Sequence, residues 1–252
     1  MIGAIIGDIV GSRFEFNNTF SKNFDLFTKD CDFTDDTICT IAIADAIMNK
    51  KSYTDSLVYW CRKYPNPKGC YGGSFSLWIL GNNHLPYNSF GNGSAMRVSS
   101  VAWLFNTEEE VIKQARLTAM VSHNHPEGIK GAECIALAIY MLRKGSPDSE
   151  IISRLNEYYP NFLNNHYQKG VFNETCQGTI PVCLQIFFNS SSFENAIRNA
   201  ISFGGDSDTI GAIVGSMAEA KFGIPEKIKQ QCLRFLPEEM VDVINRFNNE
   251  KF

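Results

Sequence analysis

The sequence predicts an all-α protein, folded as a single compact multi-helix domain over residues 1–252. Apolar residues recur every three and four positions along most of the chain, which is the helical period. No run of alternating β-branched residues is present, and Asn92-Gly93 lies between Gly91 and Ser94 rather than between two strands. With 44% hydrophobic and 20% charged residues, the chain can bury a large core.

Glycine occupies every fourth position of the expected amino-terminal helix, at Gly3, Gly7 and Gly11, and Gly211 and Gly215 repeat this spacing. Glycine is poor inside a helix unless another backbone approaches closely. The two segments can therefore pack at short distance, which would bring the residues after Gly11 beside the acidic cluster that precedes Gly211. For the glycines alone, tight packing without functional meaning is the better interpretation.

The helical period predicts further helices at 35–49, 107–120, 129–143, 175–188, 193–202, 208–222, 226–235 and 238–248. Short helical segments are expected after the glycine-rich turns at 71–74 and 89–94. Polar stretches at 15–33, 61–93 and around 159–175 are longer than ordinary connections between helices, so we consider them candidate binding loops.

Charge and cysteine content narrow the class of protein. A net charge of -4 and a pI near 5.6 argue against nucleic acid as the main partner. The eight cysteines show no CxxC pair and no zinc spacing, so buried free thiols in a reducing cytoplasm are expected. The apolar start of the chain is short and contains Asp8, which predicts neither a signal peptide nor a membrane span. We expect a cytoplasmic monomer without a membrane partner.

Two acidic clusters lie far apart in the sequence, and each places two carboxylates and a threonine hydroxyl within about one helical turn. They are Thr34-Asp35-Asp36-Thr37 and Gly204-Gly205-Asp206-Ser207-Asp208-Thr209. Either cluster alone fits a helix N-cap, where acids favour the positive end of the dipole. Together they favour metal binding, because four converging carboxylates repel one another and Mg²⁺ or Mn²⁺ prefers such oxygen ligands. If they meet in space, they predict a two-metal site.

Backbone N–H groups at helix starts could bind an anion. Tyr71-Gly72-Gly73-Ser74 and Ser89-Phe90-Gly91-Asn92-Gly93-Ser94 each precede a helical segment. One such turn is usually a plain loop, but two beside a metal site suit a substrate that carries a pyrophosphate. His123 and His125 have no partner at zinc spacing, so we favour a loop histidine that hydrogen-bonds substrate over a metal ligand.

These strings, in this order, resemble the ADP-ribosylglycohydrolase family over residues 7 to 209. The matching segments are Gly7-Asp8-Ile9-Val10-Gly11 with Glu15, Phe33-Thr34-Asp35-Asp36-Thr37, Gly72-Gly73, Phe90-Gly91-Asn92-Gly93-Ser94-Ala95-Met96-Arg97, Ser122-His123 with Gly131-Ala132, and Gly204-Gly205-Asp206-Ser207-Asp208-Thr209. The resemblance implies an all-α fold and a binuclear site holding two Mg²⁺ or Mn²⁺ ions.

The resemblance also implies a role for each matching residue. The implied metal ligands are Thr34, Asp35, Asp36, Asp206, Asp208 and Thr209. The implied substrate-binding residues are Gly72, Gly73, Ser89, Phe90, Gly91, Asn92 and His123. Glu15 matches a family glutamate beside the metals, and Glu15, Asp35 or Asp36 would act as general acid or base. Segments 16–32 and 159–175 carry no family motif, and because they shape the acceptor side in relatives, the acceptor stays open.

The expected function is a metal-dependent hydrolase that cleaves the glycosidic bond between ADP-ribose and an acceptor, on a protein or a small molecule, and releases ADP-ribose. One alternative is a metal-dependent nucleotide phosphohydrolase, in which the same acids would direct attack at phosphorus. A second is a non-catalytic module that binds ADP-ribose. Every implied metal ligand and Glu15 are present, so the sequence gives no support to loss of catalysis.

Overall fold

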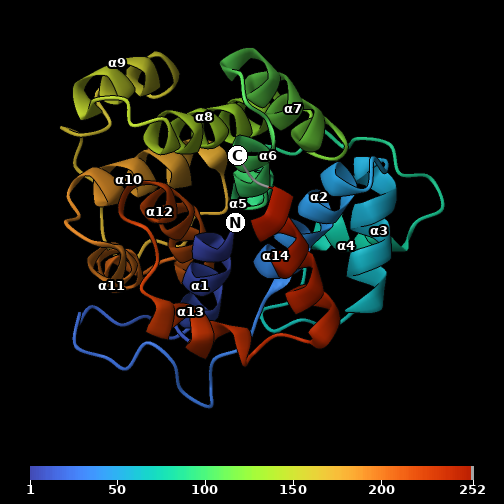
Figure 1. Ribbon diagram of the computed structural model, residues 1–252, viewed down its shortest axis with the longest axis horizontal. Helices are drawn as coiled ribbons and strands as arrows, with labels where there is room; N and C mark the ends of the chain where they lie inside the picture. Colours follow the sequence, from blue (N-terminus) through green and yellow to red (C-terminus); the bar gives the residue numbers. More distant parts are fainter. Residues whose placement is uncertain (251–252) are drawn as a thin grey trace.

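Helices form the whole regular structure of residues 1–250, which is the part of the chain that the computed structural model describes (Figure 1). Within this range no strand occurs, and the two β-bridges, Thr34–Lys68 and Gly91–Thr175, each join single residues of loops or loop edges. The prediction of an all-α fold is confirmed.

In chain order the helices are α1 (Ile2–Gly11), α2 (Asp35–Met48), α3 (Tyr53–Lys63), α4 (Gly73–Leu80), α5 (Gly93–Met96), a 3-10 turn (Val98–Ser100), α6 (Val101–Leu104), α7 (Glu108–Met120), α8 (Pro126–Arg143), α9 (Asp148–Tyr158), α10 (Cys176–Phe188), α11 (Phe193–Phe203), α12 (Ser207–Phe222), α13 (Glu226–Leu233) and α14 (Glu238–Glu250). None of these helices combines the length and the apolar character that crossing a membrane requires.

The buried helices α1 and α12 lie side by side in the middle of the fold and pack backbone against backbone (Figure 1). A Cβ atom on Gly7 would lie 1.9 Å from the carbonyl oxygen of Gly211, and one on Gly3 would lie 2.2 Å from that of Gly215. A Cβ on Gly11 would lie 2.5 Å from the oxygen of Ser207. The expected close packing is confirmed, and it holds the end of α1 against the start of α12.

Helix α2 is buried from Asp36 to Ala46, and it is apolar around most of its circumference. Thr34 caps its start, because the threonine side chain accepts a hydrogen bond from the Asp36 N–H. The helix is followed by Lys50, whose φ of 54° lies in the left-handed region. The N-terminus of α2, with its two acids, lies beside the start of α12, because Thr209 is hydrogen-bonded to Asp36.

The eight helices predicted from periodicity at residues 35–248 all occur, with ends shifted by no more than three residues. Two helices were missed, α3 and α9, because each buries only a narrow stripe. Helix α9 buries Ile151 and Leu155 alone, and α3 buries four residues around Leu57. All eight cysteines are free thiols, and all but Cys70 are buried, as predicted.

Candidate active site

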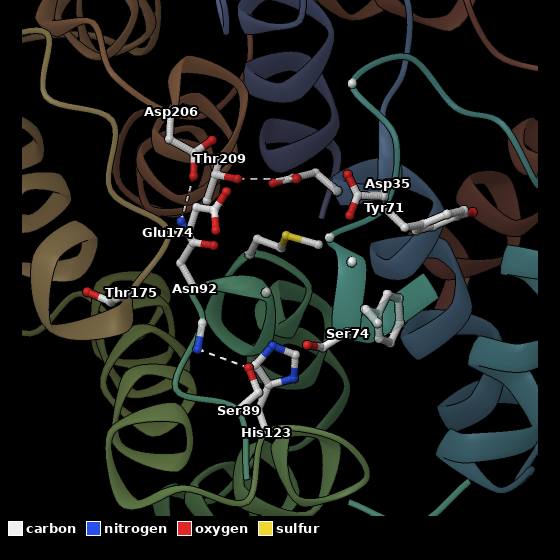
Figure 2. A pocket seen from close by; sticks show the side chains of 18 of the residues that line it. Asp35, Tyr71, Ser74, Ser89, Asn92, His123, Glu174, Thr175, Asp206 and Thr209 are labelled. Carbon is white, nitrogen blue, oxygen red and sulfur yellow. Dashed lines mark hydrogen bonds between the residues drawn. The ribbon is translucent and has the colours of Figure 1, made fainter. Parts of the chain in front are cut away.

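A cavity of about 660 Å³ opens where the N-termini of α2, α4, α5 and α12 converge. This volume lies within the usual range for small-molecule sites, about 300–1,000 Å³. Acids line one end of the cavity, and glycine-rich loops with a histidine line the other (Figure 2). Four helix N-termini directed at one space favour bound negative charge.

The two acidic clusters meet at this cavity. Asp35 and Asp36 enter it from α2, and Asp206, Asp208 and Thr209 enter it from the start of α12. The Thr209 hydroxyl donates a hydrogen bond of 3.3 Å to Asp36 Oδ2 and so links the two helices directly (Figure 2). The proximity predicted from sequence is therefore present in the structure.

Burial and mutual repulsion act on these carboxyl groups. Burial raises the pKa of Asp35, Asp36 and Asp208 well above the ordinary value, and the neighbouring carboxylates raise it further. Burial also raises the pKa of Asp206, while side-chain hydrogen bonds, among them the one from the Asn92 amide, oppose the shift. A cluster of this kind is costly unless protons or a cation neutralise it.

The donor set fits a hard divalent cation. Asp36 Oδ1 and Asp208 Oδ1 are buried and accept no hydrogen bond from the described residues, so each has lone pairs available. As the side chains stand in residues 1–250, no group of three or more His, Cys, Asp and Glu residues is arranged to hold an ion. The residues that would hold a cation are the acids that line the cavity. Their carboxylates would have to change rotamer to converge on one ion.

Asp8 holds the first acidic cluster in place through hydrogen bonds to its two threonines. This fully buried residue of α1 accepts hydrogen bonds from the backbone N–H and the hydroxyl of both Thr34 and Thr37, over 2.5 to 3.0 Å. Burial nevertheless raises the pKa of Asp8 to about 6. The Thr34 hydroxyl thus has two protein partners, Asp8 and the Asp36 N–H, and it is not part of the cavity lining.

Glu15 lies at the acidic end of the cavity, just after α1. Its Oε2 is buried without a hydrogen-bond partner among the described residues, and a Cβ on Gly69 would lie 2.5 Å from it. Gly69 has a φ of 79°, a conformation that favours glycine, and a side chain there would displace the Glu15 carboxylate. Burial first, then the charges of Asp206 and Asp8, raise the pKa of Glu15 to about 7, near the value that suits proton transfer.

The predicted glycine-rich turns both line the cavity. Gly72 and Gly73 begin α4, and a Cβ on either would meet open space. The second turn is tied to the segment before α10, because the Asn92 N–H donates to Glu174 O over 2.7 Å. The Asn92 amide donates to Asp206 Oδ2 over 2.7 Å, so it connects the turn to the acidic cluster (Figure 2).

His123 faces the same space from the other end (Figure 2). Its ring is buried, and burial together with the Arg97 charge lowers its pKa well below the ordinary value. His123 is therefore neutral at pH 7. His125 instead caps α8, where its Nδ1 accepts from the Glu127 N–H.

Several lining residues were given no role by the sequence. Arg97 is buried beneath the cavity, and Phe16 and Phe172 stack at 6.0 Å between ring centroids on its rim. Phe172 and Glu174 belong to the segment around 159–175, and Phe16 to 15–33, which were predicted as binding loops but carried no motif. Asp8 was detectable as the one charged residue in an otherwise apolar helix.

Comparison with known proteins agrees with this fold. The sequence profile of the ADP-ribosylglycohydrolase family matches residues 1–251. The chain is 24% identical to ADP-ribosylhydrolase ARH3 of Mus musculus, with 97% of this chain and 88% of that protein covered. It is also 24% identical to the ADP-ribosyl-[dinitrogen reductase] glycohydrolase of Rhodospirillum rubrum, with 89% and 85% covered.

A solved structure described as an ADP-ribosylglycohydrolase-related protein complex matches with a TM-score of 0.76 at 20% identity, covering 99% of this chain and 96% of that one. The chain belongs to the ADP-ribosylglycohydrolase family.

Proposed function

We propose that this protein is a metal-dependent hydrolase that cleaves the glycosidic bond between ADP-ribose and an acceptor and releases ADP-ribose. The observation that carries the proposal is the convergence of the two acidic clusters at one end of a single cavity, with Asp36 Oδ1 and Asp208 Oδ1 unpaired. Membership of the family and the activities for which its relatives are named support the same reaction.

Two Mg²⁺ or Mn²⁺ ions bound to the acidic clusters would orient the ribose hydroxyls and lower the pKa of a bound water. The residues that line the cavity and would hold these ions are Asp35, Asp36, Asp206, Asp208 and Thr209. Thr34 stays a proposed ligand, although its hydroxyl already has two hydrogen-bond partners.

The chain's own residues supply the remaining chemistry. Gly72 and Gly73 present backbone N–H groups to the diphosphate, and the turn at 89–93 and His123 line the same end of the cavity. Cleavage at the ribose carbon develops positive charge on the sugar, and the carboxylates of Asp35 and Asp36 stabilise it. Glu15, whose pKa is about 7, holds or accepts the proton that passes between water and the acceptor.

The acceptor is the open part of the proposal. One relative is named ADP-ribosylarginine hydrolase Tri1, from Pseudomonas putida, with 24% identity over 96% of this chain and 76% of that protein. The names of the relatives favour an ADP-ribosylated protein as substrate, and a small molecule that carries ADP-ribose is the second class to test.

The test is to incubate the protein and Mg²⁺ or Mn²⁺ with arginine-linked, serine-linked and nucleotide-linked ADP-ribose and to identify the products by chromatography and mass spectrometry. Release of intact ADP-ribose from one substrate is expected, and it would also identify the acceptor. Release of AMP or phosphate would contradict the proposal in favour of a phosphohydrolase. Binding of ADP-ribose without turnover of any substrate would favour the binding module.

A further inference from the structure

Arg97 is a buried cation with uncharged hydrogen-bond partners. Its side chain is 1% exposed, and its Nη2 donates to Thr118 O and to Ser122 Oγ, both over 2.9 Å. Its Nε is buried without a partner among residues 1–250. The guanidinium keeps its charge in proteins, and a buried charge with so few partners is costly.

The Ser122 hydroxyl transmits the effect of Arg97 to His123. A guanidinium can only donate, so Ser122 Oγ is the acceptor of the bond from Arg97. The same oxygen lies 2.8 Å from His123 Nδ1. If Nδ1 carried a proton, Ser122 Oγ would accept twice, and its own hydrogen would be buried without a partner. The arrangement that satisfies every group has Ser122 donating to a bare Nδ1.

The neutral His123 ring then carries its one proton on Nε2. This nitrogen is turned toward the glycine-rich turn, since a Cβ on Gly93 would lie 3.0 Å from it and a Cβ on Gly91 would lie 3.4 Å from it. The absence of side chains at these two positions leaves space beside Nε2. In Figure 2 the His123 ring stands in the cavity with Ser89 and Ser74 nearby.

We propose that Arg97 is a positioning residue which, through Ser122, holds His123 as the Nε2–H tautomer so that a neutral donor faces the anionic part of the substrate. The opposite tautomer would direct a lone pair at an anionic oxygen and repel it. The nature of the ligand, a diphosphate, rests on the proposed function, but the tautomer is a property of the protein alone.

The first test measures the tautomer without substrate. The chain has four histidines, and long-range ¹H–¹⁵N correlation spectra of ¹⁵N-histidine-labelled protein at pH 7 distinguish their protonation states. A His123→Gln variant assigns the resonance. A bare Nδ1 with a protonated Nε2 is expected at His123. An Nδ1–H tautomer or a doubly protonated ring would overturn the proposal.

The second test removes the intermediate hydroxyl. In Ser122→Ala, His123 is expected to lose its single tautomer, and the Kd for ADP-ribose by calorimetry is expected to rise about tenfold, the effect of one net hydrogen bond. Ser100→Ala is the matched control, because Ser100 is also fully buried but its hydroxyl has no partner in the described residues.

The Ser100→Ala control should keep the wild-type tautomer of His123 and the wild-type affinity for ADP-ribose. A Ser122→Ala protein that keeps the Nε2–H tautomer, or binds ADP-ribose as wild type does, would overturn the role of Arg97. Because the spectra require no substrate, a failure of the proposed hydrolase activity leaves the tautomer result intact, so the two failures are distinguishable.

Discussion

The Thr209 hydroxyl donates a hydrogen bond of 3.3 Å to Asp36 Oδ2, although the two residues are 173 positions apart in the sequence. This contact joins the first turns of α2 and α12, each of which carries acids at the positive end of a helix dipole. The close packing of α1 on α12 fixes the start of α12, because Gly11 lies against the backbone of Ser207 and Asp208. The acidic site is therefore built on the closely packed ends of helices.

Asp208→Asn should separate metal binding from folding. Loss of one ligand charge is expected to lower the turnover rate by at least about 10²-fold, because a catalytic metal contributes several kcal/mol. The same change removes a repulsive buried charge, so the metal-free variant should melt at a higher temperature than metal-free wild type. Assays and thermal melts with EDTA and with Mn²⁺ check both effects.

The control for this variant is Asp55→Asn, which also removes an acid from a first helical turn but at an exposed position on α3. It should change neither the activity nor the stabilisation by Mn²⁺. An Asp208→Asn enzyme with wild-type turnover would show that this carboxylate does not belong to the reactive centre.

The metal-free protein should lose stability as pH rises. The pKa is about 6 for Asp8 and about 7 for Glu15, and it is raised well above the ordinary value for Asp35, Asp36 and Asp208. These folded-state values exceed the unfolded values near 4, so between about pH 4 and 7 the folded chain binds more protons. The free energy of unfolding therefore falls as pH rises through this window.

Thermal melts in EDTA from pH 5 to 8 check this sign. Saturating Mn²⁺ should flatten the slope, because the cation replaces the protons on the clustered acids, while the contribution of Asp8 remains. A metal-free protein that is more stable at pH 8 than at pH 5, or a slope unchanged by Mn²⁺, would contradict the assignment of the cluster as a cation site.

Asp8→Asn should damage the site without touching the cavity. The amide cannot accept all the hydrogen bonds that the carboxylate receives from Thr34 and Thr37, and its NH₂ would face their N–H groups. We expect a loss of about 2 kcal/mol in unfolding free energy, measured by urea titration, together with reduced activity. Unchanged activity would mean that Asp35 and Asp36 keep their positions without Asp8.

Gly7→Ala tests the close packing of α1 on α12. Alanine normally favours a helix interior by about 0.5–1 kcal/mol over glycine. Here the added methyl group would lie 1.9 Å from Gly211 O, so we expect destabilisation of about 2 kcal/mol or more from overpacking. Gly73→Ala is the control, because its Cβ would meet open space. Equal stability of the two variants in urea titration would refute the packing argument.

The fold and the acidic site were accessible from the sequence because their signals are local. Helical periodicity marks helices with broad buried faces, and it missed α3 and α9 because their apolar stripes are narrow. Both acidic clusters are visible because the acids of each cluster fall within one turn. That Thr209 reaches Asp36 is a property of the packing, which no local pattern contains.

Residues that act through distant partners were not given a role. Asp8 binds Thr34, which is 26 positions away, and Arg97 binds Ser122, which is 25 positions away. Glu174 reaches the cavity from a polar stretch whose position depends on its hydrogen bond with Asn92. Thr34 was expected as a ligand because it starts the cluster, and only the structure shows that its hydroxyl is engaged by Asp8.

The most direct test of the central claim is the divalent-cation dependence of ADP-ribose release. The protein is stripped with EDTA, then assayed on its best ADP-ribosylated substrate before and after Mg²⁺ or Mn²⁺ is restored. No release is expected in EDTA, and intact ADP-ribose should be released again once the metal is restored. Full turnover in EDTA, or no release from any substrate with the metal restored, would contradict the claim.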